Sequence, residues 1–295
     1  MPTRTDDKVM IYFLLQQFFV YSLILFQKKI ITTAIYYNSQ ITILYLIQLI
    51  NYRMFVPSLL VARKFASKGA SLILNARNVN KLSALKEELE KQYGAKIYLL
   101  PFDVRDRKAA TSALESLPKE WQSIDILVNN AGLVIGTDKE QEGSLDEWDI
   151  VIDTNIKALL AMTRLIVPGM VERKRGHIIN IGSIAGDAAY PGGSVYCATK
   201  AAVKALSDGL RIDLVDTPLR VTNIKPGLVE TNFSVVRFRG DKEKADNVYK
   251  GIRPLTGDDI AETVYFAASV PEYMQIAEML VMPTNQATGT IVSRK

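Results

Sequence analysis

Short apolar runs and helical repeats alternate along the chain from about Leu59 to the C-terminus. Apolar runs bounded by polar segments predict buried strands, which we expect at Ser71–Asn75, Ala95–Asp103, Ile124–Val128, His177–Ile181 and Arg220–Ile224. Apolar positions three and four residues apart predict helices, at Asn80–Tyr93, Arg105–Leu117, Leu145–Arg173 (with a break near Pro168–Gly169) and Val195–Val215. Strands that alternate with helices predict an α/β fold with one doubly wound parallel sheet and helices on both faces.

Residues with polar or special backbone properties gather where the predicted strands end. They are Arg77, Asp103, Asn129–Gly132, Ser183 and Pro226–Gly227. In open parallel sheets, ligands bind beyond the carboxyl ends of the strands. The sequence therefore predicts a ligand site at this edge of a single domain, residues 59–295, which contains no internal repeat.

The first 58 residues differ in composition from the rest. All 17 glycines lie at or after Gly69, whereas six of the 13 tyrosines precede residue 60. Val9–Phe26 is an uncharged run long enough to cross a membrane, with Lys28–Lys29 as a flank. Gln16 and Gln17 weaken this interpretation because they would carry polar groups into lipid. A cleaved signal peptide fits less well, since no small-residue cleavage site follows the apolar run.

A third interpretation of this atypical segment is that it is not selected protein sequence. Ile, Tyr, Phe, Asn and Lys have A+T-rich codons, so an intronic or untranslated stretch translated in frame would look like this. We favour this third interpretation, a mis-spliced gene model over residues 1–58. The membrane anchor through residues 9–26 is second.

Composition excludes several classes of function. The chain holds 36 Lys+Arg and 31 Asp+Glu, and three of the five surplus positive charges lie in the first 60 residues. A basic face for nucleic-acid binding is therefore not indicated. The single cysteine, Cys197, excludes an internal disulfide and a cysteine-built zinc site. The single histidine, His177, argues against a Ser-His-Asp hydrolase or a multi-histidine metal site, and we expect no metal.

Tyr196 and Lys200 stand four residues apart in a predicted helix, so their side chains share one face. A free phenol has a pKa of about 10, and a nearby ammonium lowers that pKa by favouring the phenolate. Tyr196 could then exchange a proton with a substrate hydroxyl or carbonyl. Such a pair is common on solvated helices, but Ser183 at a strand end could donate to the same carbonyl oxygen. Asn155 could hold a water beside Lys200, although alone it is better explained as a helix-surface residue.

These residues occur in the order and approximate spacing of the short-chain dehydrogenase/reductase family, which the sequence resembles from about Leu59 to Gln286. The resemblance implies a Rossmann-type sheet with Tyr196 as general acid/base and Ser183 as the group that orients and polarises the carbonyl. It implies that Lys200 lowers the pKa of Tyr196 and binds the nicotinamide ribose, and that Asn155 anchors a proton-relay water. Further cofactor contacts are implied for Asp103, Val104, Asn130, Ala131, Gly132, Pro226, Gly227, Val229 and Thr231.

The residues after the strand at Ser71–Asn75 favour NADP over NAD. An acidic residue there binds the NAD ribose, whereas a basic one accepts the extra phosphate of NADP. No carboxylate follows this strand, and Arg77 can form a charge-assisted pair with phosphate. A cation at a helix N-terminus is otherwise electrostatically unfavourable. Many members of the family carry a second arginine where Asn78 stands, and its absence weakens the preference.

One departure from the family concerns its glycine-rich turn, Thr-Gly-x-x-x-Gly-x-Gly, whose glycines let backbone approach the pyrophosphate. Counting back from Ala62–Ala66 places this turn near Asn51–Ser58, which contains no glycine. Ile41–Ile50 can imitate the apolar first strand, but Tyr52 and Phe55 would put side chains where phosphate oxygens belong. As written, the chain should bind NADP poorly. We hypothesise that the true product has a glycine-rich N-terminus in place of roughly the first 58 residues.

Finer resemblance points to the NADP-dependent 3-hydroxy acid dehydrogenases, which include serine 3-dehydrogenase and L-allo-threonine dehydrogenase activities. It lies in Gly182–Gly186, Tyr190–Gly193, Phe233–Gly240 and Met282–Gln286. It implies oxidation of a β-hydroxyl with hydride transfer to the nicotinamide. The substrate carboxylate needs a partner, for which Arg237 is the candidate and Arg239 the second choice. Both arginines are equally well explained as surface charges on a lid helix.

Two other functions compete with a soluble, cytoplasmic dehydrogenase that forms a homo-oligomer, a tetramer or dimer by family analogy. One is a membrane-anchored NADP-dependent reductase of steroids or other lipids. The other is a non-catalytic Rossmann-fold interaction protein that has lost the cofactor turn. Asn155, Ser183, Tyr196 and Lys200 argue against the latter, and the missing glycines argue for it.

Overall fold

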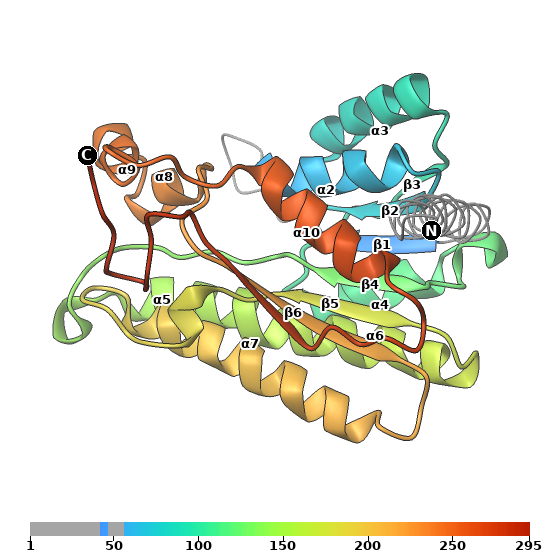
Figure 1. The fold of residues 1–295 in the computed structure, drawn as a ribbon. Helices are drawn as coiled ribbons and strands as arrows, with labels where there is room; N and C mark the ends of the chain where they lie inside the picture. The colour runs from blue at the N-terminus through green and yellow to red at the C-terminus, as the bar shows by residue number, and fades with distance from the viewer. Residues whose placement is uncertain (1–41, 47–55) are drawn as a thin grey trace, which may run out of the picture. The chain divides into compact units, whose positions relative to one another are not determined.

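The computed structural model describes residues 42–46 and 56–295 of the 295-residue chain. Its centre is a parallel sheet in the order β3-β2-β1-β4-β5-β6-β7 (Figure 1). The strands are β1 Thr42–Leu46, β2 Ser71–Asn75, β3 Ile97–Leu99, β4 Ile126–Asn129, β5 His177–Ile181, β6 Arg220–Pro226 and β7 Glu278–Val281. Every neighbouring pair of strands is parallel. The order reverses direction between β1 and β4, which is the switch point of a doubly wound sheet.

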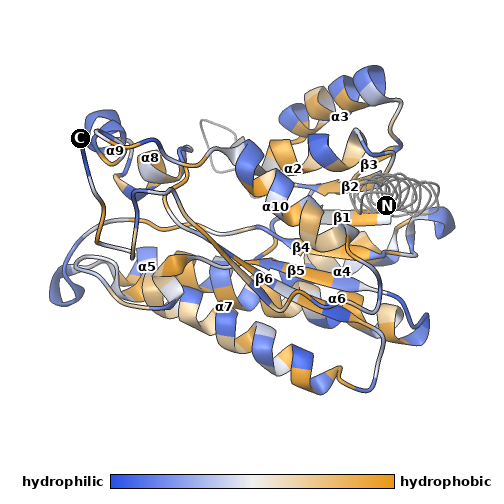
Figure 2. Cartoon of the chain, viewed as in Figure 1, coloured by the Kyte–Doolittle hydropathy of each residue, from blue (hydrophilic) through white to orange (hydrophobic). Residues whose placement is uncertain are grey.

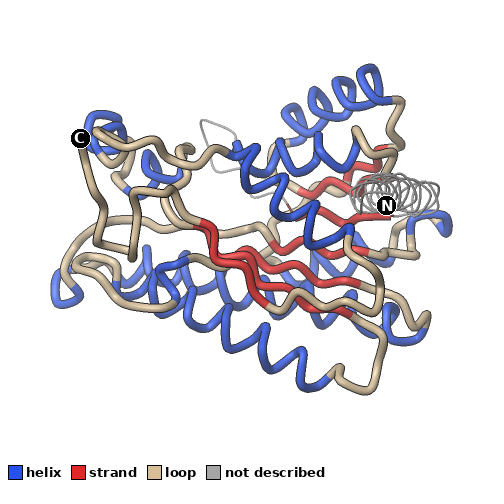
Figure 3. Tube along the Cα trace, viewed as in Figure 1, coloured by secondary structure: helices blue, strands red, loops and turns tan. Residues whose placement is uncertain are grey.

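Helices cover both faces of this sheet (Figure 3). Apolar side chains of α2, α3 and α10 pack on one face, and those of α4, α6 and α7 pack on the other. The bounds are α2 Val56–Ala66, α3 Val79–Tyr93, α4 Arg107–Glu115, α5 Leu145–Ile152, α6 Leu159–Glu172, α7 Ser194–Asp213, α8 Phe233–Arg237, α9 Lys242–Asn247 and α10 Gly257–Ser269. The predicted α/β class with a doubly wound parallel sheet is confirmed.

Local sequence explains the well-predicted helices. In α3 the leucines at 82, 85 and 89 are buried, while the opposite face is hydrophilic (Figure 2). Asn78 caps its first turn, because the Asn78 side chain accepts a hydrogen bond from the Lys81 backbone N–H. Gly94 ends the helix at φ +63°, a left-handed conformation that glycine adopts without strain.

Two predicted boundaries were wrong. The region Leu145–Arg173 does not break at Pro168, which lies inside α6. Its irregularity comes earlier, as a π-helix at Asp153–Ala158 between α5 and α6. The strand predicted at Ala95–Asp103 is paired only over Ile97–Leu99. Beyond it, the carbonyls of Leu100 and Phe102 accept hydrogen bonds from the buried side-chain amide of Asn75, the last residue of β2.

The N-terminal part enters the sheet through β1, which pairs with β2 on one side and β4 on the other. Of the run Ile41–Ile50, which was expected to imitate a first strand, the described residues Thr42–Leu46 form β1. The proposed membrane anchor lies in Val9–Phe26, and most of the segment where the glycine-rich turn is expected lies in Asn51–Phe55. Both runs are outside the described residues. The domain boundary at residue 58 therefore stays a prediction. Among the described residues, no helix is both long enough and apolar enough to span a bilayer.

Within the same residues, no three His, Cys, Asp or Glu side chains cluster as metal ligands would.

Candidate active site

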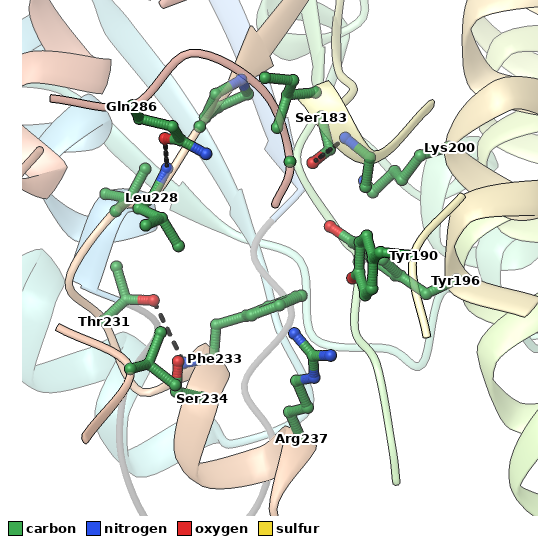
Figure 4. A pocket seen from close by; sticks show the side chains of 18 of the residues that line it. Ser183, Tyr190, Tyr196, Lys200, Leu228, Thr231, Phe233, Ser234, Arg237 and Gln286 are labelled. Carbon is green, nitrogen blue, oxygen red and sulfur yellow. Dashed lines mark hydrogen bonds between the residues drawn. The ribbon is translucent and has the colours of Figure 1, made fainter. Parts of the chain in front are cut away.

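A cavity of about 440 Å³ lies beyond the carboxyl ends of β5 and β6 (Figure 4). Most of the residues singled out from the sequence line it. They include Asn130 and Gly132 after β4, Ser183 after β5, Tyr196 and Lys200 on α7, Pro226 at the end of β6, Gly227, Val229 and Thr231 after it, and Arg237 on α8. Arg77, Asp103, Val104, Ala131 and Asn155 do not line this cavity.

Lys200 is a buried cation beside the Tyr196 ring. Its Nζ donates a hydrogen bond of 2.8 Å to the Ile181 carbonyl at the end of β5 and lies 5.8 Å from the centroid of the Tyr196 ring. Only 6% of Lys200 and 7% of Tyr196 is solvent exposed. Burial disfavours the charged ammonium and lowers the pKa of Lys200 to about 8. The pair is thus placed inside the cavity wall and not on a solvated helix face.

The surroundings of Tyr196 act on its pKa in opposite directions. Burial of the phenol raises the pKa above its usual value, and the neighbouring Tyr190 phenol acts in the same direction. A hydrogen bond with Ser183 and the positive charge of Arg237 act to lower it. In this geometry burial outweighs Ser183 and Arg237, so the pKa of Tyr196 is raised overall, and the lowering by Lys200 expected from the sequence is not seen.

Ser183 is held where β5 gives way to a single 3₁₀ turn, Ile184–Gly186. Its Oγ accepts a hydrogen bond of 3.1 Å from the Ala185 backbone N–H. This contact fixes the hydroxyl at the start of the turn. Ser183 and Tyr196 line the same cavity, and Ser183 acts on the pKa of the Tyr196 phenol, so both hydroxyl groups face one substrate space.

Asn155 is turned inward by the π-helix and is 1% exposed, so it is not the surface residue that its isolated position suggests. Its Oδ1 accepts from the Leu133 N–H at 2.8 Å, and its Nδ2 donates to the Leu133 carbonyl and to Thr199 Oγ1 at 2.9 and 3.0 Å. A Cβ built on Gly132 would lie 3.3 Å from Lys200 Nζ and 3.5 Å from Asn155 Oδ1. Gly132 therefore leaves a narrow polar space between these two side chains.

Arg77 lies at the end of β2, as expected, but it is not isolated. Its Nη1 is 3.5 Å from Asp103 Oδ2. The Arg105 side chain donates hydrogen bonds of 2.7 to 3.2 Å to the same carboxylate. Hydrogen bonds from Arg105 and the charges of both arginines hold the pKa of Asp103 below its usual range against the effect of burial. Asn78, the position of the missing second arginine, serves instead as the cap of α3.

The two candidate partners for a substrate carboxylate are in different places. Arg237 lines the cavity (Figure 4). Arg239 points away from it into an ion-pair cluster, with Glu147 at 2.7 Å and with Asp138. The acids around Arg239 raise its pKa further. Arg239, the second choice from the sequence, is thus already neutralised by protein carboxylates.

Several residues of the site had no role that could be predicted from the sequence. Gln286 is buried near the C-terminus, and its Oε1 accepts a 2.8 Å hydrogen bond from the Leu228 N–H across 58 residues of chain. A Cβ built on Gly227 would lie 2.3 Å from this oxygen, so the Gln286 side chain packs directly against the Gly227 backbone, where any other residue would clash. Tyr190 and the tail residues Gly289, Thr290, Val292 and Arg294 also line the cavity. The segments Tyr190–Gly193 and Met282–Gln286 stood out in the sequence only through resemblance.

The family is settled by comparison with known proteins. Residues 59–242 match the family model described as short chain dehydrogenase. The chain belongs to the short-chain dehydrogenase family. Its match begins where the alternating strand and helix pattern of the sequence begins.

Relatives within this family are similar over most of the chain. An NADP-dependent 3-hydroxy acid dehydrogenase of Schizosaccharomyces pombe is 47% identical over 224 residues, which is 76% of this chain and 86% of that protein. A serine 3-dehydrogenase of Rhizobium radiobacter is 42% identical over 226 residues, 77% of this chain and 89% of that protein. Among solved structures, the closed form of serine dehydrogenase complexed with NADP+ is 41% identical, with a TM-score of 0.78 over 86% of this chain and 100% of that one.

Proposed function

We propose that this protein is an NADP-dependent oxidoreductase that moves a hydride between the cofactor and the hydroxyl-bearing carbon of a small 3-hydroxy acid such as serine or allo-threonine. The observation that carries the proposal is that Ser183, Tyr196 and Lys200 share one cavity with the cation of Arg237. The names of the relatives support the same class of cofactor and substrate.

Each catalytic residue has a role that its contacts support. Tyr196 takes the proton of the substrate hydroxyl during oxidation and returns it during reduction. Ser183, which lines the same cavity as Tyr196, orients the same oxygen and stabilises its partial charge. Lys200 holds the nicotinamide ribose, and Asn155 anchors a water in the polar space beside Gly132 through which the proton leaves.

The residues at the strand ends fit a dinucleotide. Asn75 at the end of β2 and Asn129 at the end of β4 flank β1, and each has a buried Oδ1 without a hydrogen-bond partner among the described residues. When bound, NADP supplies the hydride acceptor. We assign Arg77 to its extra phosphate and Asp103 and Val104 to the adenine end. The remaining contacts are Asn130, Ala131, Gly132, Tyr196, Lys200, Pro226, Gly227, Val229 and Thr231.

Arg237 is the proposed partner of the substrate carboxylate. Its Nε is buried and has no hydrogen-bond acceptor among the described residues, and a buried cationic donor without a partner is costly. A planar guanidinium can bind a carboxylate through two parallel hydrogen bonds. A 3-hydroxy acid held in this way would place its β-hydroxyl toward Ser183 and Tyr196.

A substrate panel at NADP concentrations that saturate the chain tests the proposal, because weak cofactor binding would otherwise hide the activity. We expect NADP reduction with L-serine, L-allo-threonine and 3-hydroxybutanoate, and slower reduction with NAD. Steroid alcohols should not be oxidised. A chain that reduces NADP with none of the acids, or prefers uncharged alcohols, would refute the assignment.

We also propose a homo-oligomer, dimer or tetramer, in the cytoplasm. Leu160 on α6 and Ile212 on α7 are exposed apolar side chains that a contact between copies would cover. The single cysteine is compatible with a reducing compartment. Light scattering of the purified chain gives the mass that decides between monomer and oligomer.

A further inference from the structure

The cavity contains a cation that is held by aromatic rings. Three basic side chains line the cavity among the described residues: Lys200, Arg237 and Arg294. Lys200 donates to the Ile181 carbonyl, and Arg294 donates to the carbonyls of Val248 and Lys250. The contacts of Arg237 are of another kind, because its guanidinium carbon lies 5.1 Å from the centroid of the Tyr190 ring and 5.7 Å from that of Phe238.

Tyr190 and Arg237 come from segments far apart in the sequence. Tyr190 lies in the loop before α7, and Arg237 is the last residue of α8. Figure 4 shows the Arg237 guanidinium directed toward the Tyr190 ring across the cavity. A guanidinium over an aromatic face is attracted by the ring quadrupole and loses rotational freedom, while its N–H groups stay available at the edge.

The Tyr190 ring is itself fixed by the loop that carries it. A Cβ built on Gly193 would lie 2.1 Å from Tyr190 Cε2, so the ring rests directly on the bare Gly193 backbone. The Gly193 N–H donates to the Tyr190 carbonyl at 3.1 Å and closes the turn. Gly192, at φ +66°, lies so close to Thr137 that a Cβ would meet the Thr137 carbonyl oxygen at 2.3 Å. Glycine at both positions therefore sets where the ring stands.

We propose that Tyr190 determines specificity for anionic substrates, as the aromatic platform that holds the Arg237 guanidinium in position to bind the substrate carboxylate. This inference rests on the proposed function, since it needs the carboxylate to bind at Arg237. Tyr190 acts through Arg237, and its ring, not its hydroxyl, carries the role. The Tyr-Pro-Gly-Gly turn is then part of the substrate site.

Binding of a matched pair of ligands tests this inference. The probes are 3-hydroxybutanoate and its neutral isostere 3-hydroxybutanamide, titrated calorimetrically into the full chain with NADPH, so that no turnover occurs. We expect Tyr190→Leu to weaken binding of the acid about three- to tenfold, the range of a cation–π contact at a partly exposed site. Binding of the amide should change less than about twofold. Tyr190→Phe, which keeps the ring, should bind the acid like the parent chain.

Two further variants separate the platform from a general effect on folding. Gly193→Ala leaves Tyr190 intact but displaces its ring, and should weaken acid binding in the same selective way. In an Arg237→Ala background, Tyr190→Leu should have no additional effect on acid binding, because the two residues act as one unit. Thermal unfolding of each variant verifies that the comparison is made between folded proteins.

The outcomes distinguish this inference from the function on which it rests. If the parent chain binds the acid no better than the amide, or Arg237→Ala leaves acid binding unchanged, the carboxylate site itself is refuted. If Arg237→Ala weakens acid binding but Tyr190→Leu does not, the platform role is refuted and the carboxylate site stands. Equal losses for acid and amide in Tyr190→Leu, or additive losses in the double variant, also overturn the platform role.

Discussion

At the scale of one residue, burying the Lys200 ammonium in the site lowers the stability of the folded chain. Burial lowers its pKa from 10.5 to about 8, so the unfolded chain binds this proton more tightly than the folded chain. The resulting penalty is complete below about pH 8 and disappears above about pH 10.5. Lys200→Met should therefore raise the free energy of unfolding by roughly 1–3 kcal/mol at pH 7, after the lost hydrogen bond to Ile181 is included. Urea unfolding at pH 7 and pH 10 checks this, and an advantage that does not shrink at pH 10 contradicts it.

Arg237 links substrate charge to the chemistry of Tyr196. Its positive charge acts to lower the pKa of the Tyr196 phenol. Arg237→Ala should therefore raise that pKa and move the rise of kcat/KM for a neutral alcohol to higher pH. For 3-hydroxy acids the same change should mainly raise KM. Steady-state profiles over pH with both substrate types measure the two effects, and an unchanged KM for the acids would remove Arg237 from the site.

The sequence predicted individual site residues well where they follow strands, and poorly where they depend on remote contacts. Ser183 and Asn130 stand at strand ends, which topology alone brings to one edge of the sheet. Asn155 was ambiguous because its burial comes from the π-helix, which periodicity does not predict. Gln286 and Tyr190 gave no signal of a role, since each acts through residues from another part of the chain.

At the scale of elements, a buried ion cluster ties the loop after β5 to the sheet edge. Lys225 Nζ on β6 lies 2.7 Å from Asp187 Oδ1, after the Ser183 turn, and 2.7 Å from Glu278 Oε1 on β7. Lys225 is buried between two partly exposed carboxylates, so its removal leaves them without the cation they share. Lys225→Met should cost about 1–3 kcal/mol of stability and lower kcat by releasing the Ser183 turn.

Denaturant unfolding and kcat measured on the same preparation check that prediction. Lys204→Met is a matched control, because Lys204 pairs with Asp208 on the surface of α7 and its loss should have little effect. A Lys225→Met variant with parental kcat would mean that the cluster does not position Ser183.

The elements themselves differed in how visible they were in the sequence. α3 and α7 have clear helical spacing and were predicted within about one or two residues of their observed bounds. β7 was not predicted: its apolar run, Met279–Met282, is only four residues long, and its side chains alternate between exposed and half-buried. α8 and α9 are only 5 and 6 residues long, too short for a periodic pattern.

At the scale of the whole molecule, the N-terminal part decides how tightly NADP can bind. The family match begins at residue 59, and the segment Asn51–Ser58 offers no glycine to a pyrophosphate. In a chimera, the first strand and turn of the Schizosaccharomyces pombe relative replace residues 1–58. We expect the unaltered chain to bind NADP at least about tenfold more weakly than this chimera. Equilibrium titration with NADP compares the two proteins. Equal affinities would show that the printed segment supplies a phosphate site without glycines.

The central claim is that the Tyr196 phenol transfers the proton of a 3-hydroxy acid in the cavity beyond β5 and β6. Its most direct test is the rate of NADPH formation from 3-hydroxybutanoate by this chimera and by its Tyr196→Phe variant. The substitution removes one hydroxyl and keeps the ring packed against Phe233, 5.4 Å away between centroids. We predict a loss of about 10²–10⁴-fold in kcat. A variant that retains kcat within a few-fold of the parent would contradict the account.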